Sequence, residues 1–213
     1  MDWRTWHEKY DSPDSRMARR LRTVQDQIRF VLDHTRSGPF RAISLCAGQG
    51  RDLLEVLACH PKRGDVRARL VELDEQNTAV AAEFARANML DQVEIVTGDA
   101  SLTDQYRSMA PADLVLICGL FGNISDDDIK RTIDACPQLC ATGGHVIWTR
   151  HRRTPDRVPS ICERFEALGF DQRWLSGDDT ELGVGVHRFA GAPRPLETGR
   201  SLFRFIGYDR LVN

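Results

Sequence analysis

Residues 42–57 read AISLCAGQGRDLLEVL and change character within a few positions. Apolar and small residues run up to Leu45, which is typical of a buried strand. After three small residues, Leu53, Leu54 and Leu57 recur at the spacing of one helix face. The stretch therefore predicts a strand, a tight turn and a helix.

The turn in this stretch contains Gly48 and Gly50, which carry no Cβ and so let the backbone come close to a ligand. The helix that begins near Arg51 directs unpaired N–H groups at the same place. Together these features predict a site for a small ligand. Glycine turns between a strand and a helix also occur for packing alone, so the segments that follow must decide between the two interpretations.

The composition indicates a soluble chain with one domain and an appendage. Its 213 residues, 41% of them hydrophobic, are enough to bury one good-sized core. The net charge of −2 gives no overall positive field, so we expect neither a nucleic-acid nor a membrane partner. The N-terminus lacks the apolar core of a signal peptide, and no run reaches about 18 apolar residues. These features predict a cytoplasmic protein.

The cysteines indicate neither disulfides nor a metal site. The chain has six of them, no two form a C-x-x-C pair, and most fall inside apolar runs. A thiol in such a run behaves as a small hydrophobic group. We therefore expect no zinc or other metal.

The first 37 residues form an N-terminal helical arm, and residues 38–213 form the main domain. Within residues 16–35 the apolar side chains fall on one face, which predicts a helix that covers the sheet. Trp3, Trp6 and Tyr10 precede any core element. These rings either close over a flat ligand as a lid or simply anchor the arm, and the sequence leaves both open.

A carboxylate stands at the end of the second predicted strand, residues 66–74. Glu72 follows the glycine turn by about 20 residues, where an acidic residue in a nucleotide-binding α/β unit can accept both hydrogen bonds of a ribose diol. Asp74 directly precedes an alanine-rich helix, residues 75–90, and is better explained as its cap. Glu72 is therefore the candidate for ligand binding.

The third predicted strand, residues 93–96, is closed by Thr-Gly-Asp-Ala. Asp99 in this sequence is placed to recognise an exocyclic amine, or else to cap a helix around residues 101–109. We favour the ligand role, because Asp99 would belong to the third successive strand end with suitable chemistry.

The fourth predicted strand, residues 112–118, is almost continuously apolar, as expected of a central parallel strand that is covered on both faces. The loop Gly-Leu-Phe-Gly-Asn follows it. In a doubly wound sheet such a loop carries reacting groups, so we expect Phe121 and Asn123 to line the crevice. Asn123 could equally stabilise a turn.

The C-terminal part supplies the remaining strands. Residues 145–149 form a strand that runs into Arg-His-Arg-Arg, residues 150–153, which either faces an anionic substrate through Arg152 or forms a solvated rim. The rim is the simpler interpretation. A helix over residues 159–168 is followed by three segments with strand character, residues 170–175, 183–189 and 202–208. At least two of them should pair antiparallel at the sheet edge.

This order of motifs resembles the class I S-adenosylmethionine-dependent methyltransferases over residues 40–208, and it leaves the N-terminal arm unmatched. The resemblance implies an α/β fold with a doubly wound, seven-stranded, mostly parallel Rossmann-like sheet and an antiparallel C-terminal edge. It implies S-adenosylmethionine as cofactor. The implied contacts are Cys46, Ala47, Gly48, Gln49 and Gly50 around the methionine part, Glu72 at the ribose, Leu73 and Ala100 beside the adenine, Asp99 at its amino group, and Cys118 and Gly119 at the sulfonium.

Two positions depart from the family pattern. Ser44 replaces the acidic residue that usually opens the glycine motif, and Cys46 replaces its first glycine. Both are small, so cofactor binding remains compatible with them. The usual contact to the methionine amino group must then come from elsewhere, and Tyr10 is the residue we expect to supply it.

The mechanism that the resemblance implies is in-line displacement of the methyl group by an acceptor oxygen, nitrogen or carbon. His151 lies just beyond a central strand and is the candidate general base, with His7 as the second choice. The Asn/Asp-Pro-Pro-Tyr motif of enzymes that methylate nucleobase or glutamine amines is absent. We therefore expect a small-molecule acceptor, contacted by Trp6, Phe121, Asn123 and Arg152.

Two alternatives remain. A non-catalytic S-adenosylmethionine-binding regulatory protein would explain the departures at Ser44 and Cys46. A nicotinamide-dependent oxidoreductase would also use a glycine turn and an acidic residue about 20 positions later. The missing G-x-G-x-x-G and Tyr-x-x-x-Lys patterns argue against the oxidoreductase.

Overall fold

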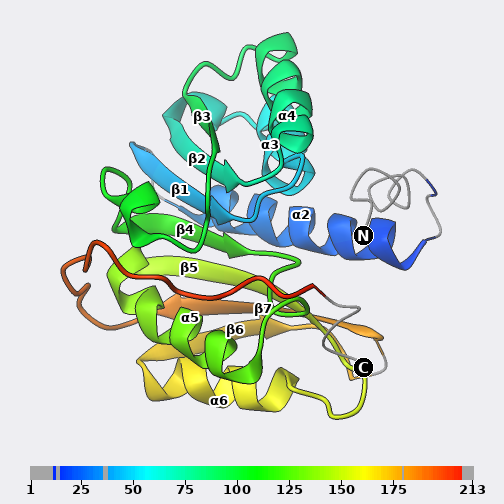
Figure 1. The fold of residues 1–213 in the computed structure, drawn as a ribbon. Coiled ribbons are helices and arrows are strands. Elements are labelled where there is room, and N and C mark those ends of the chain that lie inside the picture. The colour runs from blue at the N-terminus through cyan, green and yellow to red at the C-terminus, as the bar shows by residue number, and fades with distance from the viewer. Residues whose placement is uncertain (1–11, 13–14, 36–37, 179, 208–213) are drawn as a thin grey trace.

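The computed structural model describes residues 12, 15–35, 38–178 and 180–207. Its strands are β1 (Phe40–Leu45), β2 (Val66–Glu72), β3 (Val93–Thr97), β4 (Ala112–Ile117), β5 (Cys140–His151), β6 (Phe170–Leu175) and β7 (Leu182–Phe189). They form one seven-stranded sheet in the order β3-β2-β1-β4-β5-β7-β6 (Figure 1).

Neighbours among β1 to β5 pair parallel, whereas β7 pairs antiparallel with both β5 and β6. The predicted seven-stranded, mostly parallel sheet with an antiparallel C-terminal edge is therefore confirmed. The prediction of a strand over residues 202–208 is wrong for the part that the structure describes. Just before it, Ser201 makes an isolated bridge with Leu102, and residues 202–207 bond to the loops after β3 and β4 through Leu202 N to Ser101 O and Ile206 N to Asn123 O.

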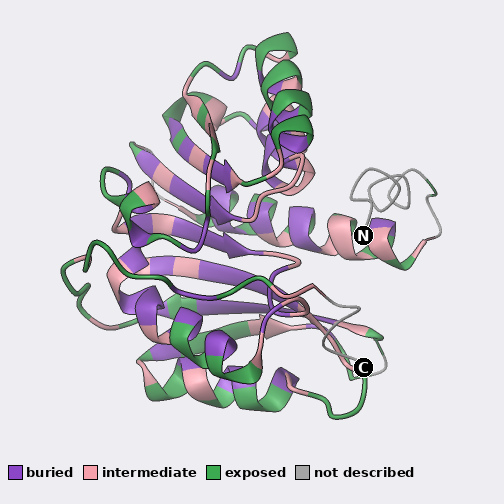
Figure 2. Ribbon diagram, viewed as in Figure 1, coloured by how far each residue is buried: buried purple, intermediate pink, exposed green. Residues whose placement is uncertain are grey.

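Helices cover both faces of the sheet (Figure 1). On one face lie α2 (Arg16–His34), α3 (Arg51–Cys59) and α4 (Glu75–Ala87), and on the other lie α5 (Asp126–Leu139) and α6 (Val158–Ala167). Figure 2 shows buried positions along the central strands and on the sheet-facing sides of the helices. Two clusters of buried side chains result, one for each face. This layering is that of a doubly wound sheet.

Helix α2 belongs to the packed core. Val24, Ile28 and Leu32 are almost completely buried, in the same cluster as the leucines of α3. At its C-terminus the ammonium group of Lys62 donates to the carbonyls of Leu32 (2.7 Å) and Thr35 (2.5 Å), which satisfies acceptors that the helix leaves unpaired. Residues 16–35 thus cover the sheet, as the sequence suggests.

The structure differs from the predicted helix around residues 101–109. A single 3-10 turn, η3 (Thr103–Tyr106), takes its place. The backbone beside it is held by the C-terminal segment instead, because Thr103 N donates to Arg200 O and Leu202 N donates to Ser101 O. These long-range contacts use backbone groups at the start of the expected helix.

No helix in the described part of the chain is both long enough and apolar enough to span a bilayer. Among the same residues, no group of three or more His, Cys, Asp or Glu side chains is arranged to hold a metal ion.

The core under α6 contains a buried polar contact. The indole Nε1 of Trp148 donates to Nδ1 of His187 across 3.1 Å, and Phe165 stacks on the imidazole at a centroid distance of 4.7 Å. Gly185 makes room for this arrangement, since a Cβ there would overlap the indole. Burial lowers the pKa of His187 from 6.5 to about 4, so its ring is neutral at pH 7.

This histidine should make the fold sensitive to acid. Its folded-state pKa lies below the unfolded value, so stability is full above pH 6.5 and is lost as pH falls toward 4. A buried imidazolium would also turn Nδ1 into a donor facing the donor of Trp148. We expect this residue to reduce the free energy of unfolding by about 2 kcal/mol between pH 7 and pH 5.

Urea unfolding of the wild type and of His187→Gln at both pH values measures this contribution. The variant should be less stable at pH 7 but lose less stability at pH 5. Equal losses of stability in the wild type and in His187→Gln would contradict the assignment. His145→Gln measures in the same way the contribution of a second histidine, whose pKa is also lowered to about 4.

Candidate functional site

A cavity of about 520 Å³ opens at the carboxyl ends of β1 to β4. Its walls come from the loops that follow these strands, from helix α2 and from the C-terminal segment around Phe203 and Phe205. A single concave site of this size at the strand ends of an α/β sheet is the usual arrangement for a small ligand.

The loop after β1 forms the floor of the cavity with left-handed backbone. Cys46 has φ +49°, Gly48 has φ +55° and Gly50 has φ +68°. Cys46 therefore adopts a left-handed conformation, which favours glycine and is uncommon for a residue with a side chain. Cys46, Ala47, Gly48 and Gln49 line the cavity.

Gly50 has a different role from the one predicted. It does not line the cavity, and a Cβ there would lie 2.5 Å from Leu70 Cδ2 and 2.9 Å from Leu54 Cδ1. The missing side chain lets α3 pack closely on β2. The two interpretations of the glycine turn thus apply to different residues, since Gly48 faces the cavity and Gly50 serves packing.

Glu72 ties the first two strand ends together. Its Oε2 accepts a hydrogen bond from Gly48 N at 2.8 Å, and its Oε1 accepts one from Asp74 N at 3.0 Å. A carboxylate has about four lone-pair directions, so each oxygen retains capacity for a ligand donor. Asp74 caps α4 by accepting from Gln76 N and Asn77 N, as the sequence suggests, and it also borders the cavity.

The third strand end joins the same cavity through Asp99 and Ala100. Asp99 Oδ1 accepts from Ser101 N at 2.9 Å, and no hydrogen bond to Oδ2 is found within the described chain. Burial raises the pKa of the Cys46 thiol, and the negative charges of Glu72 and Asp99 raise it further. Both carboxylates therefore lie within electrostatic reach of Cys46, which shows that the first three strand ends converge.

The fourth strand end is held rigidly. Gly119 N donates to the Thr149 hydroxyl at 2.8 Å, and Asn123 Nδ2 donates back to Gly119 O at 2.6 Å. The carbonyl of Asn123 also accepts from Ile206 N, which attaches the C-terminal segment. Cys118, Gly119 and Asn123 all line the cavity. Asn123 therefore meets both expectations, because it borders the cavity and stabilises the turn.

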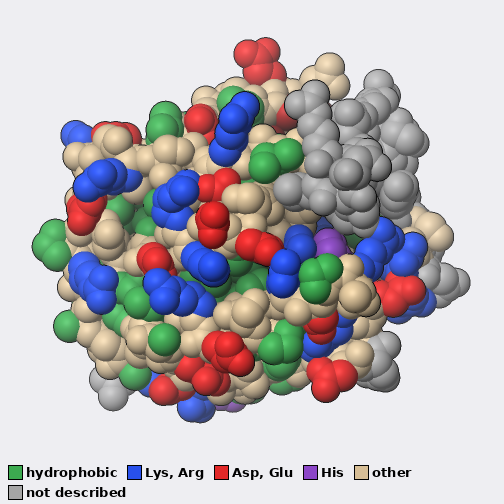
Figure 3. Space-filling view, turned by 60° about the horizontal axis from the view of Figure 1, so that its bottom comes forward, with side chains coloured by type: hydrophobic (Ala, Val, Ile, Leu, Met, Phe, Trp, Pro, Cys, Tyr) green, Lys and Arg blue, Asp and Glu red, His purple; other side chains and the backbone are tan. Residues whose placement is uncertain are grey.

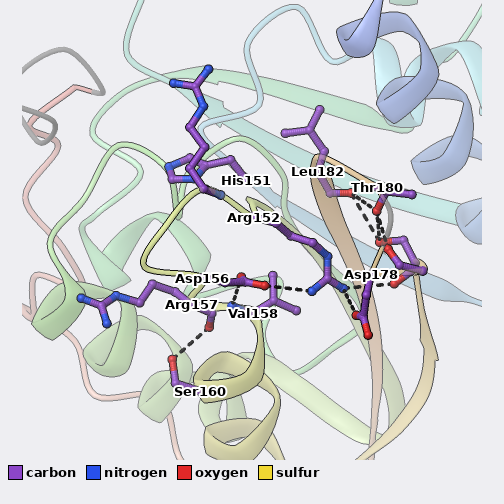
Figure 4. Close-up of polar contacts among 12 residues, drawn as sticks. His151, Arg152, Asp156, Arg157, Val158, Ser160, Asp178, Thr180 and Leu182 are labelled. Carbon is purple, nitrogen blue, oxygen red and sulfur yellow. Dashed lines mark hydrogen bonds and ion pairs between the residues drawn. The ribbon is translucent and has the colours of Figure 1, made fainter.

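Two predicted substrate contacts lie elsewhere. Phe121 is fully buried and packs against Trp148, so it does not line the cavity. Arg152 lies between Asp156 and Asp178, with N–O distances of 3.1 and 3.2 Å, and donates to Ser176 O (Figure 4). Its guanidinium links β5 to the loop before β7. The structure gives this arginine a structural role instead of the predicted contact with an anionic substrate.

The histidine predicted as general base is also outside the cavity. His151 ends β5 beside Gly122, and its side chain points away from the Arg152 network in Figure 4. Burial and the charges of Arg150 and Arg153 lower the pKa of His151 to about 4, which makes it a weak base. Trp6, His7 and Tyr10 lie outside the described residues, so their roles stay predictions.

Several lining residues were missed by sequence reasoning. They are Arg20, Leu21 and Val24 from α2, Arg51 and Asp52 from the first turn of α3, Asp74 and Asn77 at the start of α4, and Phe203 and Phe205 from the C-terminal segment. The residues of α3 and α4 carried a local signal, because they follow the glycine turn or the end of β2. The residues of α2 and of the C-terminal segment reach the cavity through long-range packing.

Charges on the molecular surface are mixed on the face that Figure 3 draws. Lys and Arg side chains alternate with Asp and Glu there, and no broad basic area is visible outside the grey atoms. This face offers no extended surface for a polyanion.

Comparisons with known proteins agree with this geometry. A family model described as "Putative methyltransferase" matches residues 16–159. The chain belongs to this family. Protein YnbC of Escherichia coli strain K12 is 26% identical over 119 residues, which are 54% of this chain and 20% of that protein. The chain thus matches only a fifth of the length of this curated relative.

Solved structures share the fold. An O-methyltransferase family protein from Burkholderia thailandensis aligns with a TM-score of 0.66 and 16% identity, over 89% of this chain and 61% of that one. The 1,6-didemethyltoxoflavin-N1-methyltransferase of the same species, solved with its substrate and S-adenosylhomocysteine, aligns with a TM-score of 0.61 and 16% identity, over 80% and 78%. The Rossmann-like methyltransferase fold is therefore confirmed.

Gly50, which is packed against Leu54 and Leu70, and Gly119, which lines the cavity, give a matched test of the packing role of Gly50. Gly50→Ala should lower the free energy of unfolding by roughly 3 kcal/mol or more, because its Cβ collides with Leu54 and Leu70 and its φ is positive. A Cβ at Gly119 would meet no atom within 4 Å. Gly119→Ala should therefore lower the free energy of unfolding only by the strain of φ +81°, about 1–2 kcal/mol. Chemical denaturation measures both, and equal losses would contradict the packing role of Gly50.

Proposed function

We propose that this protein binds S-adenosylmethionine in the cavity and transfers its methyl group to a small-molecule acceptor. The observation that carries the proposal is the convergence of three strand ends on one cavity. They present the backbone of Gly48, the carboxylate of Glu72 and the carboxylate of Asp99. Membership of the methyltransferase family supports the same assignment.

The residues present suit an adenosyl ligand. The bare backbone at Gly48 allows close approach, and the carboxylate of Glu72 retains acceptor capacity for a ribose diol. Asp99 Oδ2 suits an exocyclic amine, while Leu73, which is 69% exposed, and Ala100 offer apolar surface to a flat base. The donor and acceptor pattern thus follows adenosine from ribose to base.

When bound, S-adenosylmethionine supplies a methyl group on a positively charged sulfur. The protein's contribution is to align the acceptor with this group and to exclude water. The backbone at Gly119, fixed through Thr149 and Asn123, borders the place where the reacting atoms would lie. Because His151 lies outside the cavity, we assign no side chain as general base.

The cavity also has apolar walls beyond the adenosyl contacts. Phe203 and Phe205 border it from the C-terminal segment, and Leu21 and Val24 border it from α2. An acceptor with an apolar or aromatic body suits these walls. The 1,6-didemethyltoxoflavin-N1-methyltransferase among the structural neighbours was solved with 1,6-didemethyltoxoflavin bound, which supports a small-molecule acceptor here.

Isothermal titration with S-adenosylhomocysteine and NAD tests the cofactor assignment. We expect micromolar binding of S-adenosylhomocysteine and no binding of NAD. Transfer of a radiolabelled methyl group across a panel of small phenols, amines and heterocycles then tests catalysis. Binding without transfer to any acceptor would favour a regulatory protein, and NAD binding would overturn the proposal.

Glu72→Gln should weaken S-adenosylhomocysteine binding by about 1–3 kcal/mol, because a neutral amide accepts the diol hydrogen bonds less well and its NH₂ group faces donors. Glu75→Gln is the control, since Glu75 is exposed in the next helix and does not line the cavity. Thermal unfolding of each variant separates a folding defect from lost affinity. Unchanged affinity in a folded Glu72→Gln would remove Glu72 from the site.

A further inference from the structure

Among the described residues, four charged side chains line the cavity without a role in the adenosyl contacts, namely Arg20, Arg51, Asp52 and Asp74. Two of them, Arg20 and Asp52, come from different helices. Arg20 projects from α2, and Asp52 lies in the first turn of α3, directly after the glycine turn. They come from different segments of the chain, and the packing of α2 on α3 brings them to the same wall.

The effects of Arg20 and Asp52 on neighbouring pKa values show that both side chains lie near the end of β4. Burial raises the pKa of Asp52 from 3.8 to about 6, opposed by the hydrogen bond from Leu53 N and by the positive charge of Arg20. The pKa of the Cys118 thiol is raised mainly by burial, further by Asp52, and lowered by Arg20. Arg20, Asp52 and Cys118 therefore lie within electrostatic reach of one another.

A carboxylate and a guanidinium in one partly dehydrated wall suit a ligand that carries both charges close together. An α-amino acid does so, with an ammonium group and a carboxylate on one carbon. Arg20 offsets only part of the cost of burying the Asp52 carboxylate, because the pKa of Asp52 stays raised, and a second cation or a strong donor is required to offset the rest. An ammonium group would meet this requirement, while the guanidinium of Arg20 can bind a carboxylate through two parallel hydrogen bonds.

The position that usually meets the amino group does not reach the cavity here. Ser44 stands at that place in β1, but it is 2% exposed and does not line the cavity. Cys46 and Ala47 do line it, at the methionine end that the glycine turn defines. Asp52 follows this turn and is the nearest acidic side chain along the chain that borders the cavity.

We propose that Asp52 binds the ammonium group and Arg20 the carboxylate of the methionine part of S-adenosylmethionine. This inference rests on the function proposed above. The methionine part would then be bound by Arg20 on α2 and Asp52 on α3, and not by the residue at the position of Ser44 in β1. The pair also replaces the contact expected from Tyr10, which lies outside the described residues.

Titration with two ligands tests the pair. S-adenosylhomocysteine carries the amino-acid end, whereas 5′-methylthioadenosine shares the adenosine and thioether but lacks both charged groups. The wild type should bind S-adenosylhomocysteine at least tenfold more tightly. Asp52→Asn and Arg20→Gln should each weaken S-adenosylhomocysteine binding about 10- to 100-fold and leave 5′-methylthioadenosine within about twofold.

Arg19→Gln is the matched control, because Arg19 is exposed on the same helix and does not line the cavity. It should bind both ligands as the wild type does. Circular dichroism and the thermal midpoint verify that each variant is folded. Should one variant fail to fold, the other still tests the pair, and a wild type that binds the two ligands equally would overturn the inference without any variant.

The pH dependence gives a second readout. Asp52 must be ionised to hold an ammonium group, so affinity for S-adenosylhomocysteine should fall as pH drops below about 6, the pKa of Asp52. The charged groups that act on Asp52 are Arg20 on α2 and Glu55 on α3. The fall should be absent in Asp52→Asn and absent for 5′-methylthioadenosine.

The outcomes separate the two proposals. If the wild type binds neither ligand, the proposed function fails. If it binds both equally, or if the folded variants retain full affinity for S-adenosylhomocysteine, the cavity binds adenosine but the charged pair does not hold the amino-acid end. Loss of turnover in Asp52→Asn with unchanged S-adenosylhomocysteine affinity would instead place Asp52 at the acceptor, and would also overturn the inference.

Discussion

The parallel pairing of β1 with β2 on one side and β4 on the other is the constraint on which the site depends. Leu45 is opposite Val71, and Ser44 is opposite Leu116, so neighbouring strands end almost level with each other. Loops that are far apart in the sequence then start from one edge of the sheet. The hydrogen bond from Gly48 N to Glu72 fixes two of these loops to each other, which leaves the cavity with a defined floor before any ligand binds.

The glycine turn combines two requirements that a single glycine could not meet. The backbone must stay bare toward the cavity, which Gly48 provides, and α3 must approach β2 closely, which Gly50 provides. Cys46 shows that the left-handed conformation at the start of the turn is imposed by the surrounding structure and not by residue type. A departure from the glycine pattern at this position therefore leaves the shape of the turn intact.

The sequence predicts the parts of the molecule that depend on local patterns. Runs of apolar residues locate the strands, and the polar residues after them locate Glu72 and Asp99. The direction of a side chain is less predictable from the sequence. Phe121 and Asn123 share one loop, but Asn123 lines the cavity whereas Phe121 packs against Trp148 in the core. The sequence leaves Arg152 between a substrate contact and a solvated rim and does not predict its ion pair with Asp178, which is distant in sequence. Residues 202–207 are apolar enough for a strand, but they bond to Ser101 and Asn123 in the loops after β3 and β4 and belong to no strand of the sheet.

The two ends of the described chain determine what the cavity can hold beyond the adenosyl contacts. Helix α2 contributes a charged and apolar wall, and the C-terminal segment contributes Phe203 and Phe205 while it is fixed to Ser101 and Asn123. Neither segment belongs to the sheet. Substitutions of Leu21, Val24, Phe203 or Phe205 can therefore change the size and polarity of the cavity without disturbing the strand ends, whereas Arg20 on the same helix belongs to the proposed cofactor contacts.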